Sequence, residues 1–287
     1  MEGEQGSLMA TQPASSGASS INNVLTIAGS DPSGGAGIQA DLKTFSALGT
    51  YGTSVITALT AQNTQGVRGV FPVPASFIAE QLETLLDDVT LDAVKIGMVA
   101  SREVAEVIAD CIGRQRPRWV VLDPVMVAKS SDVLVDDAGI RAVRDILIPL
   151  ADVITPNLPE AAVLLGGDTP GSTAEMEAVM PALRRLGAPY VMLKGGHLQG
   201  ADCSDLLATP QGTTWLPAPR LATDNLHGTG CSLSSAITAC LARQPNEAPV
   251  EDAIRAAKQW LHAALEASTR LNVGKGRGPV HHFHEWW

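Results

Sequence analysis

Short apolar runs alternate with amphipathic stretches along most of this chain. The apolar runs predict strands at Val24–Ala28, Ser54–Leu59, Ala93–Ile96, Trp119–Leu122, Val153–Thr155 and Tyr190–Leu193. The amphipathic stretches predict helices at Ile38–Leu48, Phe77–Val89, Glu103–Ile112, Gly139–Leu147, Pro159–Leu165 and Ala174–Leu186. Strands that alternate with helices of this length are typical of βαβ units. The pattern therefore predicts an α/β fold with a mostly parallel sheet.

The last third of the chain breaks this alternation. Two strands, predicted at Asp205–Ala208 and Thr213–Leu216, are separated by a short turn and suit an antiparallel hairpin at the sheet edge. Two long helices follow, at Cys231–Ala242 and Val250–Leu271. Because neither a linker nor an internal repeat interrupts the pattern, we expect residues 24–287 to form a single domain.

Residues 1–23 precede this pattern and differ from it in composition. They are rich in Ser, Gly, Ala and Gln, and they lack the basic region followed by an apolar region that marks a signal peptide. They predict a disordered tail. The four cysteines, Cys111, Cys203, Cys231 and Cys240, form no CxxC pair. Without a secretion signal, free thiols in a reducing compartment are the simplest interpretation, so we expect a cytoplasmic protein.

Composition and charge exclude several classes of function. With 45% hydrophobic and 17% charged residues, the chain is suited to a globular core rather than to disorder. No apolar run is long enough to cross a membrane. The net charge is −10 and no basic run occurs, which argues against binding to a nucleic acid. An anionic small molecule would have to be bound largely by backbone amides at a helix start.

Polar and glycine-rich segments follow most of the predicted strands. In open α/β sheets ligands bind beyond the carboxyl ends of the strands, so these segments predict one site. They are Asp31–Gly37, Gln62–Asn63, Gly97–Met98, Asp123-Pro124, Asn157–Glu160, Lys194–His197 and His227–Cys231.

The segment His227-Gly228-Thr229-Gly230-Cys231 carries the clearest chemistry. Its glycines allow a sharp turn in which successive N–H groups point at one anion, and the following helix adds its dipole. Gly228, Thr229, Gly230 and Cys231 are therefore candidate catalytic residues that hold a transferring phosphate. Cys231 falls in the first helical turn, where the pKa of a thiol tends to fall. A glycine-rich helix entry with a buried cysteine explains the segment equally well.

Four residues suit the binding of nucleotide and metal. Asn157 and Glu160 open a helix after a strand, Asp123 ends another strand, and Lys194 follows a third. Carboxylates and a carboxamide suit Mg²⁺ and its bound water, which makes Glu160 and Asp123 candidate metal ligands, and a lysine neutralises phosphate charge. A glutamate in a first helical turn is also a common partner of the helix dipole. No P-loop motif GxxxxGK[ST] occurs, and Leu233 replaces the third glycine of a dinucleotide fingerprint.

Two other positions suit the recognition of a flat ring. The amide of Gln62 offers donors and an acceptor that match a ring nitrogen beside an exocyclic amine, although Gln62 also suits an ordinary strand end. Met98 either packs on a ring or belongs to the core. The tract His281-His282-Phe283-His284 looks like a metal site, but no matching ligands occur elsewhere, so a packed or exposed chain end is the better interpretation.

Together these segments resemble the ribokinase-like small-molecule kinases, and more closely the hydroxymethylpyrimidine/phosphomethylpyrimidine kinases of thiamine biosynthesis. The resemblance runs from Val24 to the end of the chain. It rests on Ala28–Lys43, Ala61-Gln62-Asn63-Thr64, Lys95-Ile96-Gly97-Met98, Asp123-Pro124-Val125-Met126, Thr155–Glu160, Lys194-Gly195-Gly196-His197, His227–Cys231 and His281–Trp287, in one order.

The resemblance implies a three-layer α/β/α sandwich and a reaction that uses ATP and Mg²⁺. The substrate would be 4-amino-5-hydroxymethyl-2-methylpyrimidine, phosphorylated first to the monophosphate and then to the diphosphate. Carried over by position, Gln62 reads the aminopyrimidine, and Ala36, Met98 and Val125 line its pocket. Asn157 and Glu160 organise Mg²⁺ and phosphate. Cys231 stands where the wider group usually has an aspartate that acts as base.

Two other functions compete with this one. Pyridoxal kinase acts on a hydroxymethyl group of a pyridine ring, which lacks the amino-pyrimidine edge that Gln62 would read. A non-catalytic module that senses a pyrimidine or nucleotide would not need the glycine-rich turn, Asn157, Glu160 and Lys194 together. We expect a homodimer, and no fused thiamine-phosphate synthase.

Overall fold

The computed structural model describes residues 20–126 and 135–287. The predicted tail lies outside the described residues as far as residue 19, and the first strand already begins at Asn23. Within the described ranges, no helix is both long and apolar enough to span a bilayer.

One central sheet of eight strands runs through the molecule. Its strands are β1 (Asn23–Ala28), β2 (Tyr51–Ile56), β5 (Ala93–Ile96), β6 (Trp119–Leu122), β7 (Val153–Ile154), β8 (Tyr190–Leu193), β9 (Asp205–Thr209) and β10 (Gly212–Leu216). Their order is β10-β9-β8-β7-β6-β5-β1-β2. All pairs from β2 to β8 are parallel, whereas β8–β9 and β9–β10 are antiparallel. The predicted α/β sheet with an antiparallel edge is confirmed.

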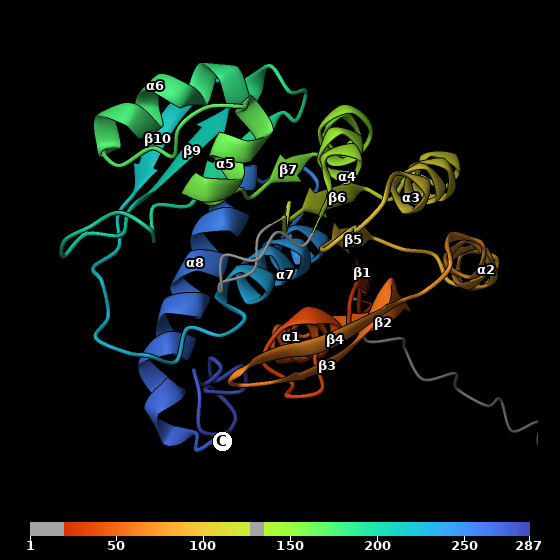
Figure 1. Cartoon of the computed structure of the whole chain (residues 1–287), viewed down its shortest axis with the longest axis horizontal. Helices are drawn as coiled ribbons and strands as arrows, with labels where there is room; N and C mark the ends of the chain where they lie inside the picture. Colours follow the sequence, from red (N-terminus) through yellow and green to blue (C-terminus); the bar gives the residue numbers. More distant parts are fainter. Residues whose placement is uncertain (1–19, 127–134) are drawn as a thin grey trace, which may run out of the picture.

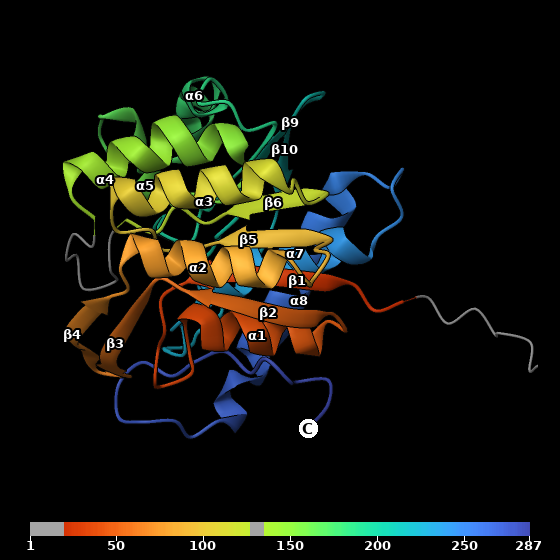
Figure 2. The same cartoon turned by 90° about the vertical axis from the view of Figure 1, so that its right-hand side faces the viewer.

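Helices cover both faces of this sheet, as Figures 1 and 2 show. One layer consists of α1 (Gly37–Ala47), α7 (Thr229–Arg243) and α8 (Val250–Glu266). The opposite layer consists of α2 (Ala75–Leu86), α3 (Arg102–Arg114), α4 (Asp137–Ala142), α5 (Leu158–Leu165) and α6 (Thr173–Arg184). Strand β6 shows the alternation, because Val120 and Leu122 join the core under the second layer while Val121 joins the core under α7 and α8. Buried on both faces, such strands consist of continuous apolar runs.

Two predicted helices change type before their predicted ends. The helix expected at Gly139–Leu147 consists of α4 followed by a π-turn at Val143–Leu147 and a 3-10 turn at Ile148–Leu150. The helix expected to reach Leu271 ends at Glu266 and continues as a 3-10 turn.

The strand predicted at Ser54–Leu59 is wrong, because the chain leaves the main sheet inside it. At Thr57 the backbone N–H donates to the Ala28 carbonyl and the hydroxyl donates to the Met98 carbonyl. Beyond this point β3 (Ala58–Asn63) pairs antiparallel with β4 (Gly66–Pro72) as a separate two-stranded sheet. All seven residues of β4 are exposed, so no alternation of apolar and polar positions predicts it.

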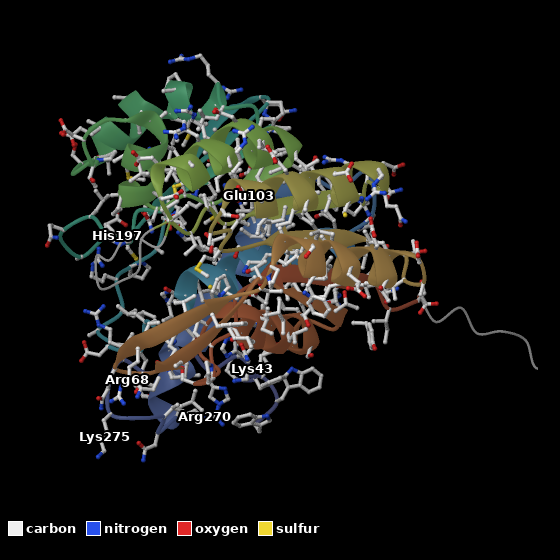
Figure 3. The ribbon with its side chains drawn as sticks, turned by 45° about the vertical axis from the view of Figure 1, so that its right-hand side comes forward. Lys43, Arg68, Glu103, His197, Arg270 and Lys275 are labelled. Atoms are coloured by element: carbon white, nitrogen blue, oxygen red, sulfur yellow. The ribbon has the colours of Figure 1, made fainter. Side chains whose placement is uncertain are left out.

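The tip of this hairpin is attached to the segment that follows α8. The Thr64 hydroxyl accepts a hydrogen bond from the Gly276 N–H, and the Thr64 carbonyl accepts one from the Arg277 N–H. Figure 3 shows Arg68 of the hairpin and Lys275 of this segment at the same end of the molecule. Basic side chains therefore gather locally at this end of an acidic chain.

The last residues of the sequence pack against α1, α7 and α8. The ring of His282 is buried, and its Nε2 lies 3.0 Å from the Ser232 hydroxyl on α7. Trp286 donates from its indole to the Ala47 carbonyl, and the His281 N–H donates to the Ala264 carbonyl. Among the described residues no group of three or more His, Cys, Asp or Glu side chains is arranged to hold a metal ion. The histidine tract packs against these helices.

Burial lowers the pKa of His282 to about 3, from an ordinary value of 6.5. Between these values the unfolded chain binds a proton that the folded chain excludes, so the free energy of unfolding falls as the pH falls. We expect a loss of up to about 1.4 kcal/mol per pH unit from this residue. Chemical unfolding of the wild type and of His282→Gln between pH 7 and pH 4 measures it, with His262→Gln as the control. Parallel losses in all three proteins would contradict this account.

Candidate active site

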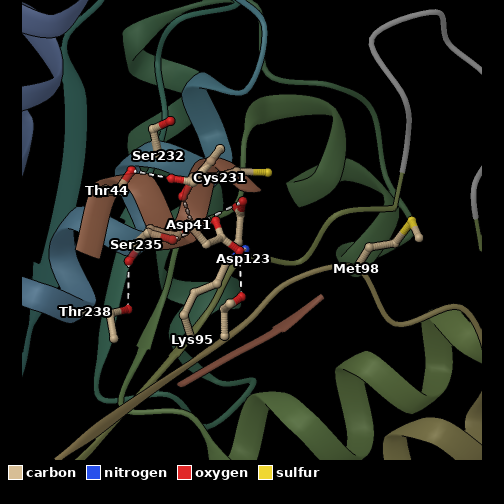
Figure 4. Close-up of polar contacts among 12 residues, drawn as sticks. Asp41, Thr44, Lys95, Met98, Asp123, Cys231, Ser232, Ser235 and Thr238 are labelled. Carbon is tan, nitrogen blue, oxygen red and sulfur yellow. Dashed lines mark hydrogen bonds and ion pairs between the residues drawn. The ribbon is translucent and has the colours of Figure 1, made fainter. Parts of the chain in front are cut away.

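Apart from Gln62–Asn63, which belongs to the hairpin, the predicted site segments lie together at the carboxyl edge of the parallel strands. Residues 29–37 follow β1, Met98 follows β5, Asp123 follows β6, and Asn157 and Lys194 follow β7 and β8. Asn157 and Lys194 form a parallel bridge that extends the sheet beyond its regular strands. The start of α7 meets the same edge, as Figure 4 shows. Sheet topology alone thus brings together segments far apart in the sequence.

The glycine-rich turn before α7 is in close contact with residues 29–37. Gly228 caps α7 with φ of 73°, a left-handed conformation that favours glycine. A Cβ atom added there would lie 1.7 Å from the Gly35 carbonyl oxygen. Because α7 begins at Thr229, the N–H groups of Gly230 and Cys231 fall in the first turn, where an α-helix supplies no acceptor of its own. These amides and the helix dipole give the turn the geometry that anion binding requires.

A buried group of charged side chains lies beside this turn. The Lys194 ammonium is 2.9 Å from Asp123 Oδ1 and 3.9 Å from Glu160 Oε2. A Cβ at Gly230 would lie 3.5 Å from both Asp123 Oδ2 and Lys194 Nζ, so the turn borders this group directly. The arrangement places a cation and two carboxylates next to the helix amides. Such a set can hold a phosphate together with its metal.

The ionisation of this group follows from burial and mutual charge. Burial raises the pKa of Glu160 to about 7, with Asp123 adding to the shift and Lys194 opposing it. Burial opposes the charge of Asp123 as well, but the ammonium groups of Lys194 and Lys95 hold its pKa below the ordinary range. Against the cost of burial, Asp123 and Glu160 raise the pKa of Lys194. Asp123 and Lys194 are therefore a charged pair at neutral pH.

Asn157 and Glu160 also form the N-terminal cap of α5. The Asn157 side chain accepts from the Glu160 N–H, and Glu160 Oε2 accepts from the Asn157 N–H, both at 2.8 Å. Glu160 therefore also has the structural role of a partner for the start of a helix. Carboxylates of this kind suit Mg²⁺ only together with phosphate oxygens, because Mg²⁺ binds through one or two carboxylates, water and substrate. The donor set fits a metal that accompanies a nucleotide.

The four residues predicted to surround a ring come from different elements, and all four are partly exposed. Ala36 caps α1, and Met98 and Val125 follow β5 and β6. Gln62 lies within β3 of the hairpin rather than at the end of a sheet strand, which corrects its predicted position. The Cys231 sulfur points toward the side of the site where Met98 lies (Figure 4).

The pKa of Cys231 is higher than its position in the helix predicts. Cys231 does lie in the first turn of α7, and the Gly37 backbone amide acts to lower the pKa of its thiol. Desolvation nevertheless raises the pKa of this thiol above its ordinary value of 9.0, while Lys95 acts in the opposite direction. The prediction of a lowered pKa is therefore wrong, because burial outweighs the helix end.

Two side-chain pairs near this turn were not predicted from the sequence. His227 Nε2 lies 2.7 Å from Asp31 Oδ2, and Asp31 also accepts from the N–H groups of Gly35 and Ala36. Burial opposes this charge, but His227 and Ser33 hold the pKa of Asp31 at about 2. Asp31 thus shapes its own loop and attaches it to the turn before α7.

The second unpredicted pair joins Asp41 of α1 to Lys95 of β5, and both side chains are fully buried. The sequence does contain a signal for it. Lys95 is the one charged residue of β5, a strand whose other residues are apolar. A lysine in such a strand needs a buried partner.

Comparison with known proteins places this chain in a family. A family model described as phosphomethylpyrimidine kinase matches residues 31–281. A hydroxymethylpyrimidine/phosphomethylpyrimidine kinase from Salmonella typhimurium is 51% identical over 265 residues, which cover 92% of this chain and 98% of that protein.

Solved structures of two kinases have the same fold as this chain. An ADP complex of Bacillus subtilis pyridoxal kinase is 38% identical with a TM-score of 0.84, covering 92% of this chain and 98% of that one. A phosphomethylpyrimidine kinase from Clostridium difficile is 42% identical with a TM-score of 0.74, covering 85% and 99%. The family model, the identity to the Salmonella typhimurium relative and the shared fold show that the chain belongs to the phosphomethylpyrimidine kinase family, within the ribokinase-like fold.

Proposed function

We propose that this chain transfers the γ-phosphoryl group of ATP to 4-amino-5-hydroxymethyl-2-methylpyrimidine, and then phosphorylates the monophosphate to the diphosphate. Both reactions belong to thiamine diphosphate biosynthesis. The observation that carries the proposal is the position of the Lys194–Asp123–Glu160 group directly beside Gly230 at the start of α7. It gives a developing phosphoryl charge both hydrogen-bond donors and a buried cation, in the chain of a kinase family.

The nucleotide would be held by residues at the ends of β6, β7 and β8. Lys194 faces the phosphates, and the capping box keeps Asn157 and Glu160 fixed at the start of α5. Asp123 and Glu160 would hold Mg²⁺ in company with the phosphate oxygens. When bound, the metal neutralises phosphate charge. The chain's own part is to fix the γ-phosphorus in line with the attacking oxygen.

Transfer then depends on the first turn of α7. The hydroxymethyl oxygen of the substrate attacks phosphorus, and the bond from phosphorus to the bridging β,γ-oxygen breaks, so that ADP leaves with that electron pair. The amides of Gly230 and Cys231 stabilise the transferring group. The alcohol proton passes to the Cys231 sulfur as the new O–P bond forms, when the alcohol is most acidic. Thr229 and Gly228 set the geometry of this turn.

The ring would lie between the hairpin and the strand ends. Ala36, Met98 and Val125 supply apolar surface, and the Gln62 amide pairs with the ring nitrogen and the amino group. Pyridoxal kinase is the second candidate, because solved structures of pyridoxal kinases match at a TM-score of 0.84. The pyridine ring of pyridoxal has no amino-pyrimidine edge, so Gln62 favours the pyrimidine.

One assay separates these functions. The protein is mixed with ATP, Mg²⁺ and either ring alcohol, and ADP release is followed. The proposal requires release with the aminopyrimidine and a second release with its monophosphate. Release with pyridoxal alone would make the chain a pyridoxal kinase. Binding of a ring without release from either would make it a sensor rather than an enzyme.

We also propose that residues 24–287 act as a single domain in a cytoplasmic homodimer. Support for a dimer comes from the β3–β4 hairpin, where the large apolar side chains of Leu59 and Phe71 lie opposite each other on one face and are both exposed. An isolated two-stranded sheet is only marginally stable in water, so a second copy that covers this face would stabilise it. The mass in solution, compared between wild type and Phe71→Lys, tests this proposal.

For Gln62→Leu we expect a KM for the aminopyrimidine that rises about tenfold or more, because the ring's polar edge loses its partners. The KM for ATP should change little, and steady-state kinetics with each substrate varied measures both. Activity with pyridoxal serves as the internal control, since that ring does not use the amide. Equal increases for the pyrimidine and ATP would mean that Gln62 only supports the hairpin.

For Cys231→Ala we expect kcat to fall by roughly 10²–10⁴-fold with both ligands still bound, the usual effect of losing a placed proton acceptor. In the wild type kcat should rise with pH, because desolvation holds the pKa of the thiol above 9.0 and the thiolate is scarce at neutral pH. Cys231→Asp should regain activity and show a flat profile above about pH 6, since a carboxylate is ionised there.

Cys203→Ala is the control for the two Cys231 variants, because it removes a thiol that lies on a loop rather than on α7. Initial rates between pH 6 and pH 10 give all the profiles. If Cys231→Ala keeps most of its kcat, the amides carry the catalysis and Cys231 is not the proton acceptor.

For Gly228→Ala we expect a loss of both stability and activity. The new Cβ collides with the Gly35 carbonyl, and φ of 73° disfavours alanine, so the turn must move away from residues 29–37. Gly196→Ala is the matched control, because a Cβ at Gly196 meets no atom within 4 Å. Thermal unfolding and initial rates should separate the two variants, and equal behaviour would refute the close contact.

A further inference from the structure

The buried pair of Lys95 and Asp41 has no role in the chemistry described so far. Lys95 Nζ lies 2.8 Å from Asp41 Oδ2, and both side chains are 0% exposed. When two charges are buried in this way, the hydration free energy that they lose can exceed the free energy of their attraction. A protein in which apolar side chains of similar volume replace such a pair is often equally stable. A pair of this kind therefore suggests a use other than stability.

Asp41 is fixed by groups from three elements. Its Oδ2 accepts from the Thr26 hydroxyl of β1 at 2.6 Å as well as from Lys95. Its Oδ1 accepts from the Ser235 hydroxyl of α7 at 2.7 Å. Both oxygens are thus occupied, and the ammonium group of Lys95 is held at one point between the sheet and the two helices.

This point lies one helical turn below Cys231. The Gly37 backbone amide at the start of α1 acts on the Cys231 thiol at the start of α7. Four residues further along both helices, Asp41 accepts from Ser235. Residues four apart lie on the same face of a helix. The seam between α1 and α7 therefore presents first the thiol and then the ion pair, as Figure 4 shows.

The ammonium group of Lys95 also extends toward the site along its own strand. Lys95 and Gly97 lie two residues apart and so face the same side of the sheet. A Cβ at Gly97 would lie 2.7 Å from Lys95 Nζ, so the ammonium occupies the space that a larger residue would fill. Gly97 is the first residue beyond β5, at the edge where the site segments meet.

Four charged groups act on the thiol from the surrounding elements. Lys95 on β5 lowers the pKa of Cys231, whereas Asp41 on α1 and Asp123 just beyond β6 raise it. Lys194 just beyond β8 also interacts with Cys231, but its ammonium group is shared between Asp123 and Glu160. Lys95 is thus the cation best placed to favour a thiolate at this position.

We propose that Lys95 is a positioning residue whose ammonium group, held by Asp41 and given room by Gly97, is the buried counter-ion of the Cys231 thiolate. The inference rests on the proposed function, in which Cys231 accepts the proton of the substrate alcohol. Lys95 keeps its own proton throughout. Its charge stabilises the anionic sulfur before transfer, and Asp41 keeps that charge in place.

The experiment measures the thiolate directly, without ATP or substrate. Iodoacetamide alkylates thiolates, and the mass of the peptide that contains Cys231 reports the rate at that residue as the pH is varied. For Lys95→Met we expect alkylation at pH 7.5 to slow about tenfold or more, which corresponds to a pKa rise of about one unit or more. For Asp41→Asn we expect faster alkylation, because an anion that opposes the thiolate is removed. The double variant should lie between these two.

Kinetics of the same variants provide the second readout. Lys95→Met should lower kcat at pH 7.5 by a factor similar to the alkylation rate, leave the KM for the pyrimidine nearly unchanged, and recover at high pH. Lys258→Met is the matched control, because it breaks a lysine–aspartate pair with Asp205 on β9. It should not move the alkylation profile of Cys231. Circular dichroism verifies that each variant is folded.

A folded Lys95→Met protein with an unchanged alkylation profile would overturn the proposal and leave Lys95 as a structural residue. If Lys95→Met does not fold, Asp41→Asn and the double variant decide, and slower alkylation in Asp41→Asn would overturn it equally. The failure of the proposed function looks different. In that case Cys231→Ala retains its kcat, while the alkylation profiles still report whether Lys95 stabilises the thiolate.

Discussion

The close approach of two backbone segments determines the rest of this site. Gly228 lies against the carbonyl of Gly35 so tightly that no side chain fits between them. This contact places the start of α7 beside the start of α1. The pair of His227 with Asp31 and the approach of the Gly37 amide to Cys231 both depend on it. A shift of the turn by one ångström would break these contacts together, because interiors at this density have little free space.

Much of the fold could be predicted from the sequence because the sheet is parallel and buried. The strands at Ala93–Ile96, Trp119–Leu122 and Tyr190–Leu193 agree with their predicted bounds, since strands covered on both faces consist of uninterrupted apolar runs. The segments of the site could be predicted for the same reason, because parallel strands all end at one edge. Strand β4 could not, because its exposed residues carry no periodic pattern.

The electrostatics of the site depend on contacts that no local pattern contains. The position of Cys231 in a first helical turn is local and was predictable, but desolvation and the charge of Lys95 decide its pKa. The partners Lys95 and Asp41 are 54 residues apart. A net charge of −10 gives no hint of the two buried lysines beside the site. For an anionic substrate the local field near the amides matters more than the total charge.

The long separation of these contacts has a consequence for synthesis. His227 reaches back 196 residues to Asp31, and Ser235 reaches back 194 residues to Asp41. A nascent chain on the ribosome can form every strand of the sheet before α7 has left the exit tunnel. Until then Asp41 and Lys95 meet without Ser235, and the loop of Asp31 has no histidine to bind. The sheet can therefore be complete in the growing chain at a stage when the candidate active site is not yet assembled.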